Sequence, residues 1–160
     1  MARERMAILY DFSAREQALI LGTSNKTELL LGYGTIHGDM ASGINPLGDL
    51  YKSQIRQLAI HLGVPEKIHH KTPTAGLWAG QTDEEELGLS YERADKILFL
   101  LVDNRKSKEE VIAAGFQKEE VEKIINLIKE SEFKRKLPPI PKLSFRTVGH
   151  DFLYPYDWDK

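Results

Sequence analysis

Residues 22–52 hold most of the side chains in this sequence that could do chemistry. The segment is dense in glycine and small polar residues, with an early carboxylate, Glu28, and a late lysine, Lys52. It opens with the letters GTSNKTE, directly after the apolar run 17–21, which is short enough for a buried strand. A turn from a strand into a helix offers free N–H groups and the positive end of a helix dipole to phosphate. These residue types, in this order, therefore predict a site for phosphate and a metal ion.

The residues alone leave two interpretations of Glu28 open. Asn25 and Glu28 have the spacing of a capping box, in which the carboxylate accepts a hydrogen bond from the backbone N–H of the cap residue. Alternatively, Glu28 is a magnesium ligand, because magnesium favours one or two carboxylates together with phosphate oxygens. Lys52 falls in the first turn of an expected helix, where the helix dipole disfavours a cation. A partner anion therefore explains Lys52 better than helix stability does.

The same segment resembles the ammonia-dependent NAD synthetases, which are ATP-pyrophosphatase-type ligases. The resemblance extends from Ala2 to Lys134, which is most of the chain. It is specific because several motifs match together with their spacing: GTSNKTE at 22–28, GD at 38–39, INPL at 44–47 and the lysine at 52.

The resemblance assigns roles to particular positions. It implies that Thr23, Lys52 and Thr74 contact ATP and that Glu28 is a magnesium ligand. It also implies that Arg3 and Lys134 contact deamido-NAD. Thr74 belongs to the proline-containing segment 72–78, and Arg3 to the N-terminal motif ARERM. Without the resemblance, Thr23 is interpreted as a turn residue or a helix cap, and the cationic residues are interpreted as solvated surface groups.

Some family positions carry different residues here. A lysine and an aspartate that contact deamido-NAD in many members correspond to Ile36 and Gly43, so these two contacts are not carried over. His37, Asp39 and Ser42 are the candidates to replace them. Phe133 likewise stands where the family usually has a histidine.

The resemblance also implies a reaction and its participants. ATP activates the nicotinate carboxylate of deamido-NAD as an adenylate, and ammonia then attacks to give NAD, AMP and pyrophosphate. This chemistry needs no enzyme nucleophile, so we assign no catalytic residue; Mg²⁺ and cationic side chains neutralise phosphate charge. The alternatives are a catalytically inactive fragment or split subunit, and another ATP-pyrophosphatase-type ligase.

One family motif does not occur in the sequence. The Ser-Gly-Gly-x-Asp-Ser loop that cradles the pyrophosphate of ATP is missing from these 160 residues. We therefore expect the chain to be a C-terminal portion, with a separate N-terminal half as a candidate partner. The expected fold is α/β, a Rossmann-like parallel sheet with flanking helices, of which this chain carries the helix-rich C-terminal part as a single domain over 1–160.

Composition narrows the class of protein further. Hydrophobic residues make up 41% of the chain, charged residues make up 29%, and the net charge is −2. These values are typical of a globular protein with no general attraction to nucleic acid or to an anionic membrane. The absence of cysteine excludes disulfides, a thiolate zinc site and a cysteine nucleophile. No apolar run approaches the length of a membrane span, so a cytoplasmic location is expected.

Hydrophobic periodicity predicts a mainly helical chain. Amphipathic helices are expected at 1–13, 48–62, 91–102, 107–113 and 118–131, of which the last three look like scaffold without chemistry. A strand is expected at 17–22, and the acidic segment 81–86 is typical of a mobile loop or lid. The tail 151–160 has four aromatic residues and is expected to pack on another surface, such as a second subunit. The family resemblance implies a homodimer.

Overall fold

The computed structural model describes residues 1–149 and 151, and its regular elements over these residues are helices. In chain order they are α1 (Ala2–Glu16), α2 (Lys26–Leu31), α3 (Lys52–His61), α4 (Glu66–His69), α5 (Asp83–Leu87), α6 (Tyr91–Leu98), the π-helix η1 (Phe99–Asp103), α7 (Lys108–Ala113), α8 (Lys118–Glu130) and the 3₁₀-helix η2 (Glu132–Arg135). The helix-rich part of the expected fold is therefore confirmed. The helices expected at 91–102, 107–113 and 118–131 are confirmed to within a few residues.

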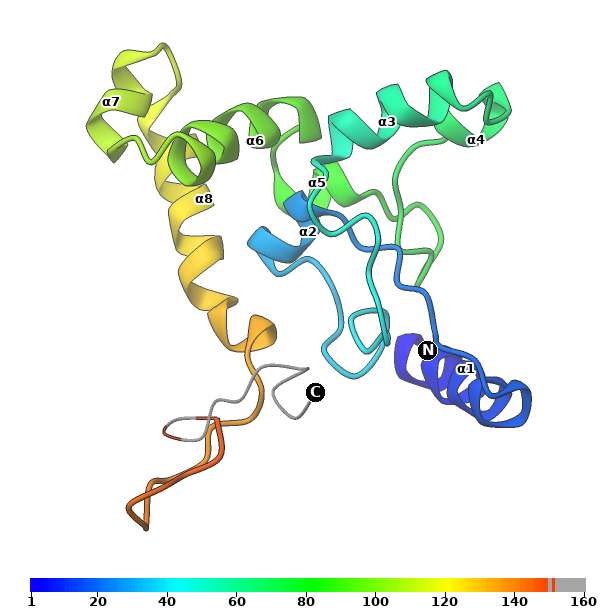
Figure 1. Cartoon of the computed structure of the whole chain (residues 1–160). Coiled ribbons are helices and arrows are strands. Elements are labelled where there is room, and N and C mark those ends of the chain that lie inside the picture. The colour runs from blue at the N-terminus through cyan, green and yellow to red at the C-terminus, as the bar shows by residue number, and fades with distance from the viewer. Residues whose placement is uncertain (150, 152–160) are drawn as a thin grey trace.

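The main hydrophobic core forms where α6 meets α2, α3 and α8. Ala94, Ile97 and Leu98 recur at helical spacing along α6, and Ile97 and Leu98 are 0% exposed. Val121 and Ile124 of α8 close the core from the other side. Figure 1 shows α3 and α8 leaving this core in different directions, with α1 apart from it at the lower right of the view. The core therefore gives α2, α3 and α6 one common support.

Helix α1 runs three residues beyond the end predicted for it at Ser13, to Glu16. It ends because Gln17 adopts a left-handed conformation, with φ of 50°. Met6 is the buried residue of this helix, whereas Leu9 and Tyr10, three and four positions later, are exposed. The Tyr10 hydroxyl donates a hydrogen bond to the Ala41 carbonyl at 2.8 Å, which fastens α1 to the loop before α3.

The prediction of a buried strand at 17–22 is wrong for this structure. The segment makes one isolated parallel bridge, between Leu21 and Ile44, and no strand forms within 1–149. The Gly22 amide donates to the Ile44 carbonyl at 2.7 Å, and the Gly43 amide donates to the Ile20 carbonyl at 2.9 Å. Leu21 is 66% exposed. A strand needs ladder partners and covered faces, and the described residues provide neither here.

Helix α3 begins at Lys52, four residues later than the start predicted for it at residue 48. The preceding residues form turns instead, because the Leu50 amide bonds to the Leu47 carbonyl at 3.0 Å. The Leu50 carbonyl accepts from the Lys26 amide at 2.8 Å, so it is unavailable to a longer helix. Lys52 is consequently the first residue of α3.

The expected acidic loop at 81–86 is also wrong, because most of it forms helix α5. The Thr82 side chain caps this helix by accepting from the Glu85 amide. Asp83 is only 4% exposed. Its carboxylate accepts hydrogen bonds from the hydroxyls of Tyr33 and Tyr91, each at 3.0 Å. These bonds explain how a carboxylate in this acidic run can be buried.

Two expectations concern the ends and the environment of the chain. Within residues 1–149, no helix has the length and apolar character needed to cross a membrane. The aromatic tail expected at 151–160 falls outside the described residues, apart from Asp151.

Candidate functional site

A cleft of about 970 Å³ opens between α1, α3 and the segments 20–24, 32–39 and 64–78. Its charged lining mixes cations and carboxylates: Arg5, Lys52, Arg56, Lys71, Lys134, Glu28, Asp39, Asp83 and Glu86. The cations outnumber the carboxylates, although the whole chain is slightly acidic. A mixed lining of this kind suits a ligand that combines phosphate groups with a divalent cation.

The cleft brings together most of the residues predicted from the sequence. Thr23, Glu28, Lys52, Thr74 and Lys134 all line it, although they come from separate parts of the chain.

Arg3 is the exception among the predicted residues, because it lies on an exposed part of α1 and does not line the cleft. Arg5 lines it instead. The sequence held a signal for Arg5, since Ala2, Arg5 and Met6 share one helical face, and all three line the cleft.

Glu28 and Lys52 form the centre of the site. The Asn25 side chain accepts from the Glu28 amide at 2.9 Å, and a Glu28 carboxylate oxygen accepts from the Asn25 amide at 3.1 Å, which confirms the capping box. The other oxygen of Glu28 accepts from the Lys52 ammonium at 2.9 Å. Both side chains are mostly covered, at 15% and 23% exposure. Glu28 is therefore an anionic partner of Lys52 in the structure, and the contact of Lys52 with ATP phosphate stays a prediction.

The Tyr91 ring lies against this ion pair, and Tyr33 shares the carboxylate of Asp83 with Tyr91. The Lys52 ammonium lies 5.1 Å from the centre of the Tyr91 ring, within range of a cation–π interaction. Burial raises the pKa of the Tyr91 hydroxyl well above its usual value, and the nearby carboxylates of Glu28 and Asp83 raise it further. Burial and a hydrogen bond to Asp83 raise the pKa of Tyr33 in the same way. Both hydroxyls are therefore donors at neutral pH.

Helix α6 was expected to be scaffold without chemistry, and none of its residues lines the cleft, but it supports the ion pair and the two helices that carry it. It supplies Tyr91 beneath Lys52, and it also carries Asp95, which is buried and accepts hydrogen bonds from Thr27 of α2 and Ser53 of α3. Little in the sequence indicates that Asp95 is buried, because acidic residues on amphipathic helices usually face water. The one signal was that Asp95 follows Tyr91 and Ala94 on the apolar side of the helix.

Lys134 reaches the cleft from η2 and contacts the end of α2. Its ammonium donates to the carbonyls of Gly32 at 2.8 Å and Gly34 at 2.9 Å. Gly32 ends α2 with φ of 68°, and a Cβ there would lie 2.0 Å from the Cβ of Ser131. Glycine is required at this position for both reasons. Lys134 thus stabilises the end of α2, and its contact with deamido-NAD stays a prediction.

Thr23 and Thr74 lie on exposed parts of the cleft wall. The Thr74 hydroxyl accepts from the Gly76 amide at 3.1 Å, which shapes the turn after it. The Arg5 guanidinium donates to the Gly76 carbonyl at 3.2 Å, so α1 is attached to the same loop. Both threonines are placed to meet a ligand in the cleft.

The acidic residues do not gather into a preformed metal centre. Over the described part of the chain, no group of three or more histidine, aspartate or glutamate side chains could hold a metal ion. A magnesium ion at Glu28 would therefore depend on phosphate oxygens and water for its remaining ligands, which is usual for magnesium.

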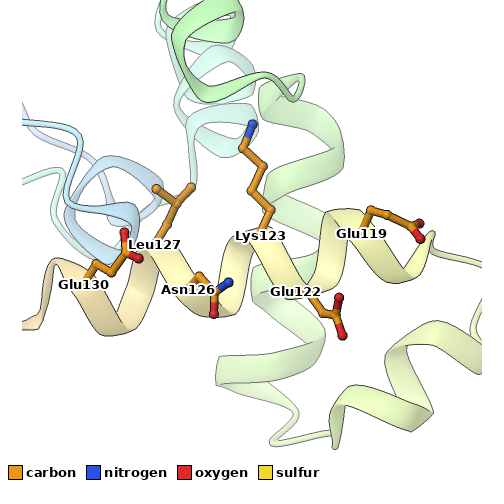
Figure 2. A pocket seen from close by; sticks show the side chains of 6 residues that line it. All are labelled: Glu119, Glu122, Lys123, Asn126, Leu127 and Glu130. Atoms are coloured by element: carbon orange, nitrogen blue, oxygen red, sulfur yellow. The ribbon is translucent and has the colours of Figure 1, made fainter.

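A second hollow, of about 400 Å³, lies on the surface of α8. Figure 2 shows Lys123 and Leu127 projecting from one side of the helix and Glu122 from the other. Carboxylates outnumber cations among its lining residues, which are Glu119, Glu122, Lys123, Asn126, Leu127 and Glu130. This hollow disfavours an anionic ligand, so the cleft at Glu28 and Lys52 is the better candidate.

The geometry defines a class of site, namely a mixed-charge cleft at the start of two helices that suits metal-bound phosphate. Comparison with known proteins identifies the family. The family model described as NAD synthase matches residues 1–138, so the chain belongs to the NAD synthase family, as the sequence motifs predicted.

Curated relatives agree over the whole chain. An NH3-dependent NAD(+) synthetase of Trichlorobacter lovleyi is 56% identical over 160 residues, which cover 100% of this chain and 59% of the relative. One from Chlorobium phaeobacteroides is 52% identical, and the chain covers 58% of it. The chain therefore spans somewhat more than half the length of these relatives.

Solved structures give the same picture. The structure of NMN synthetase from Francisella tularensis matches with a TM-score of 0.75 and 38% identity, over 88% of this chain and 53% of that one. The NH3-dependent NAD synthetase from Campylobacter jejuni matches with a TM-score of 0.69 and 37% identity, over 88% of this chain and 52% of that one.

Proposed function

We propose that this chain serves in the ATP-dependent amidation of deamido-NAD by ammonia, which yields NAD, AMP and pyrophosphate through an adenylate. One observation carries the proposal. In a member of the NAD synthase family, a single cleft collects Thr23, Glu28, Lys52 and Thr74, with Glu28 and Lys52 only 2.9 Å apart.

The ion pair suggests how Mg²⁺ and ATP would be accommodated. Without ligand, the charges of Glu28 and Lys52 neutralise each other. On binding, the Glu28 oxygen that faces Lys52 would turn to Mg²⁺, and the ammonium would turn to a phosphate oxygen. Thr23 and Thr74 would contact ATP from the walls of the cleft. Mg²⁺ would supply charge neutralisation at the phosphates, and the residues would orient the α-phosphate toward the substrate carboxylate.

Lys134 and an arginine of α1 are proposed for deamido-NAD. Lys134 lies beside the loop that begins at Gly32, at the edge of the cleft. Arg3 keeps the role that the resemblance implies, but Arg5 is better placed by geometry because it lines the cleft. Ammonia is the proposed nitrogen donor.

The isolated bridge between Leu21 and Ile44 suggests where the expected parallel sheet would form. Leu19, Leu21 and Ile44 are exposed, at 75%, 66% and 51%. We propose that this pair is one edge of a Rossmann-like parallel sheet, completed by the residues that the relatives have beyond this chain. Residues 1–160 would then be one portion of a single domain. A cytoplasmic homodimer is proposed on the resemblance alone, without nucleic acid or membrane as partners, and sedimentation tests the dimer.

The family's pyrophosphate-binding loop does not occur in this sequence, and we therefore expect low activity from the isolated chain. Each preorganised donor lost at developing charge lowers the rate by about 10²–10³, and this loop would supply several donors. We therefore expect the isolated chain to form no measurable NAD from deamido-NAD, ATP, Mg²⁺ and ammonia. Adding the family's N-terminal half, as a separate polypeptide, should restore turnover.

The assay for this proposal is NAD formation, measured by chromatography, with the chain alone and with the added half. Lys52→Met is the matched control, because it removes the cation and keeps the apolar stem; it should abolish the restored activity. Strong NAD formation by the chain alone would show that the missing loop is dispensable. No activity from the two halves together would favour the alternative of an inactive fragment.

NMN is a second candidate product because of one structural neighbour. The Francisella structure with a TM-score of 0.75 is titled as an NMN synthetase. Here Arg3, one of the two residues assigned to deamido-NAD, lies outside the cleft. Offering the complemented chain the acid precursors of NAD and of NMN in competition decides between them: an excess of NMN in the mass spectrum would favour the smaller substrate.

A further inference from the structure

Asp95 joins the two segments that carry Glu28 and Lys52, although it lies on a third helix. Its side chain belongs to a residue that is 4% exposed. One carboxylate oxygen accepts from the Thr27 hydroxyl at 2.5 Å, and the other accepts from the Ser53 amide at 2.8 Å. Thr27 directly precedes Glu28, and Ser53 directly follows Lys52. One carboxylate therefore links the side chain of the residue before Glu28 to the backbone of the residue after Lys52.

These contacts cap the start of α3 from outside the helix. Its N-cap residue is Tyr51, whose side chain makes no capping hydrogen bond to the following turn. The Lys52 amide instead donates to the Thr27 hydroxyl oxygen at 3.1 Å, and the Ser53 amide donates to Asp95. The first amides of a helix need such acceptors. Asp95 and Thr27 therefore serve the first two amides of α3, while the Gln54 side chain accepts from the Tyr51 amide at 2.8 Å.

The charge of Asp95 also offsets an unfavourable placement. Lys52 puts a cation at the positive end of the α3 dipole, which costs stability. The Asp95 carboxylate is bound to the next amide of the same turn, where the dipole favours an anion. A buried carboxylate is tolerated only when hydrogen bonds satisfy it, and both of its oxygens are bonded here.

Helix α6 also contacts the ammonium end of the Lys52 side chain. Tyr91 lies one turn before Asp95, and its ring lies 5.1 Å from the Lys52 ammonium. The backbone of α3 is therefore held at Asp95, while the ammonium rests on Tyr91. The helix that fixes both points is buried in the main core through Ile97 and Leu98, so the support is rigid.

We propose that Asp95 is a positioning residue that holds Lys52 opposite Glu28. Its consequence for catalysis rests on the proposed function, since a shift of Lys52 would move the cation away from the phosphate of ATP. The positioning itself can be measured without any nucleotide.

The test is a cycle of variants that measures how strongly Glu28 and Lys52 stabilise each other. Urea unfolding is measured for the full chain, for Glu28→Gln, for Lys52→Met and for the double variant. We expect the pair to couple by about three- to tenfold in the folding equilibrium constant. The cycle is then repeated in an Asp95→Asn background, where a single acceptor oxygen cannot serve both Thr27 and Ser53. The coupling should fall below about twofold.

Val111→Ala is the matched control. Val111 is 0% exposed on α7, and the hydrogen bonds described for it join it to Ser107 and Ala114, not to the ion pair. It should lower stability and leave the coupling unchanged. Thr27→Val provides a second test, since it keeps the side-chain shape but removes the hydroxyl that donates to Asp95 and accepts from the Lys52 amide, and Thr27→Ser should restore the coupling. The second test decides the matter where Asp95→Asn unfolds.

Two results would overturn the proposal: full coupling in both the Asp95→Asn and Thr27→Val backgrounds, or no coupling in the unmodified chain. Failure of the proposed function gives a different pattern. A chain that shows the expected loss of coupling, yet forms no NAD even with the added half, would contradict the reaction and leave Asp95 as the residue that positions Lys52.

Discussion

Glu28→Gln keeps the size of the side chain but leaves one acceptor oxygen where the carboxylate has two. In the structure, one oxygen accepts from the Asn25 amide and the other from the Lys52 ammonium. Glutamine can keep only one of these bonds, and its amide N–H₂ then faces a donor. The variant should therefore lose stability even in the absence of nucleotide.

The size of the loss follows from the two contacts. Breaking a helix cap costs about 0.5–1 kcal/mol, and a partly covered ion pair contributes about 1 kcal/mol or less. The expected loss is therefore about 0.5–2 kcal/mol of unfolding free energy. For a chain of this length, each kcal/mol lowers the melting temperature by about 2–4 °C. A decrease of about 1–8 °C should appear in thermal unfolding followed by circular dichroism.

Asn25→Ala separates the two roles of Glu28. It removes the other half of the capping box and leaves the carboxylate in place, so it should also lower the melting temperature. With Mg²⁺ and ATP added to the complemented protein, Asn25→Ala should still gain thermal stability, whereas Glu28→Gln should not. An unchanged melting temperature in Glu28→Gln would refute the estimate of stability, and a normal gain with Mg²⁺ and ATP would refute the proposed magnesium ligand.

Two further predictions concern the supports of the site. Lys134→Met removes hydrogen bonds to the carbonyls of Gly32 and Gly34 and should cost about 1–2 kcal/mol in urea unfolding; no loss would show that these bonds contribute nothing net. At Asp103, a hydrogen bond from Lys26 holds the carboxyl pKa below its usual value, so ionised Asp103 stabilises the fold above its unfolded pKa, and this contribution is lost as the pH falls through the folded pKa. Asp103→Asn should therefore flatten the loss of stability between about pH 5 and pH 2, and an acid limb identical to that of the unmodified chain would contradict this.

Local patterns carried most of the correct sequence predictions. The capping box of Asn25 and Glu28 was readable because its residues are three positions apart and interact within one turn. The helices that contain Ala94, Ile97 and Val121 were readable because their apolar residues recur at the helical period. The placement of Thr23, Glu28, Lys52 and Thr74 in one cleft followed from family motifs, which encode contacts that periodicity cannot.

The missed features depend on partners that are distant in the sequence. Asp95 bonds to Thr27 across 68 positions, and Tyr33 bonds to Asp83 across 50. Apart from the place of Asp95 on the apolar side of its helix, nothing near these aspartates in the sequence distinguishes them from solvated acids. The strand expected at 17–22 failed for a related reason, because an apolar run becomes a strand only when neighbouring strands bond to it, and in the described residues Leu21 meets Ile44 alone.

The central claim is that this cleft serves a reaction in which the substrate carboxylate attacks the α-phosphate of ATP. Deamido-NAD labelled with ¹⁸O in its nicotinate carboxylate tests this claim most directly, with the complemented protein, ATP, Mg²⁺ and ammonia. The adenylate route predicts that one labelled oxygen of the carboxylate appears in AMP, and that pyrophosphate stays unlabelled. Label in inorganic phosphate or pyrophosphate, or release of ADP in place of AMP, would contradict the account.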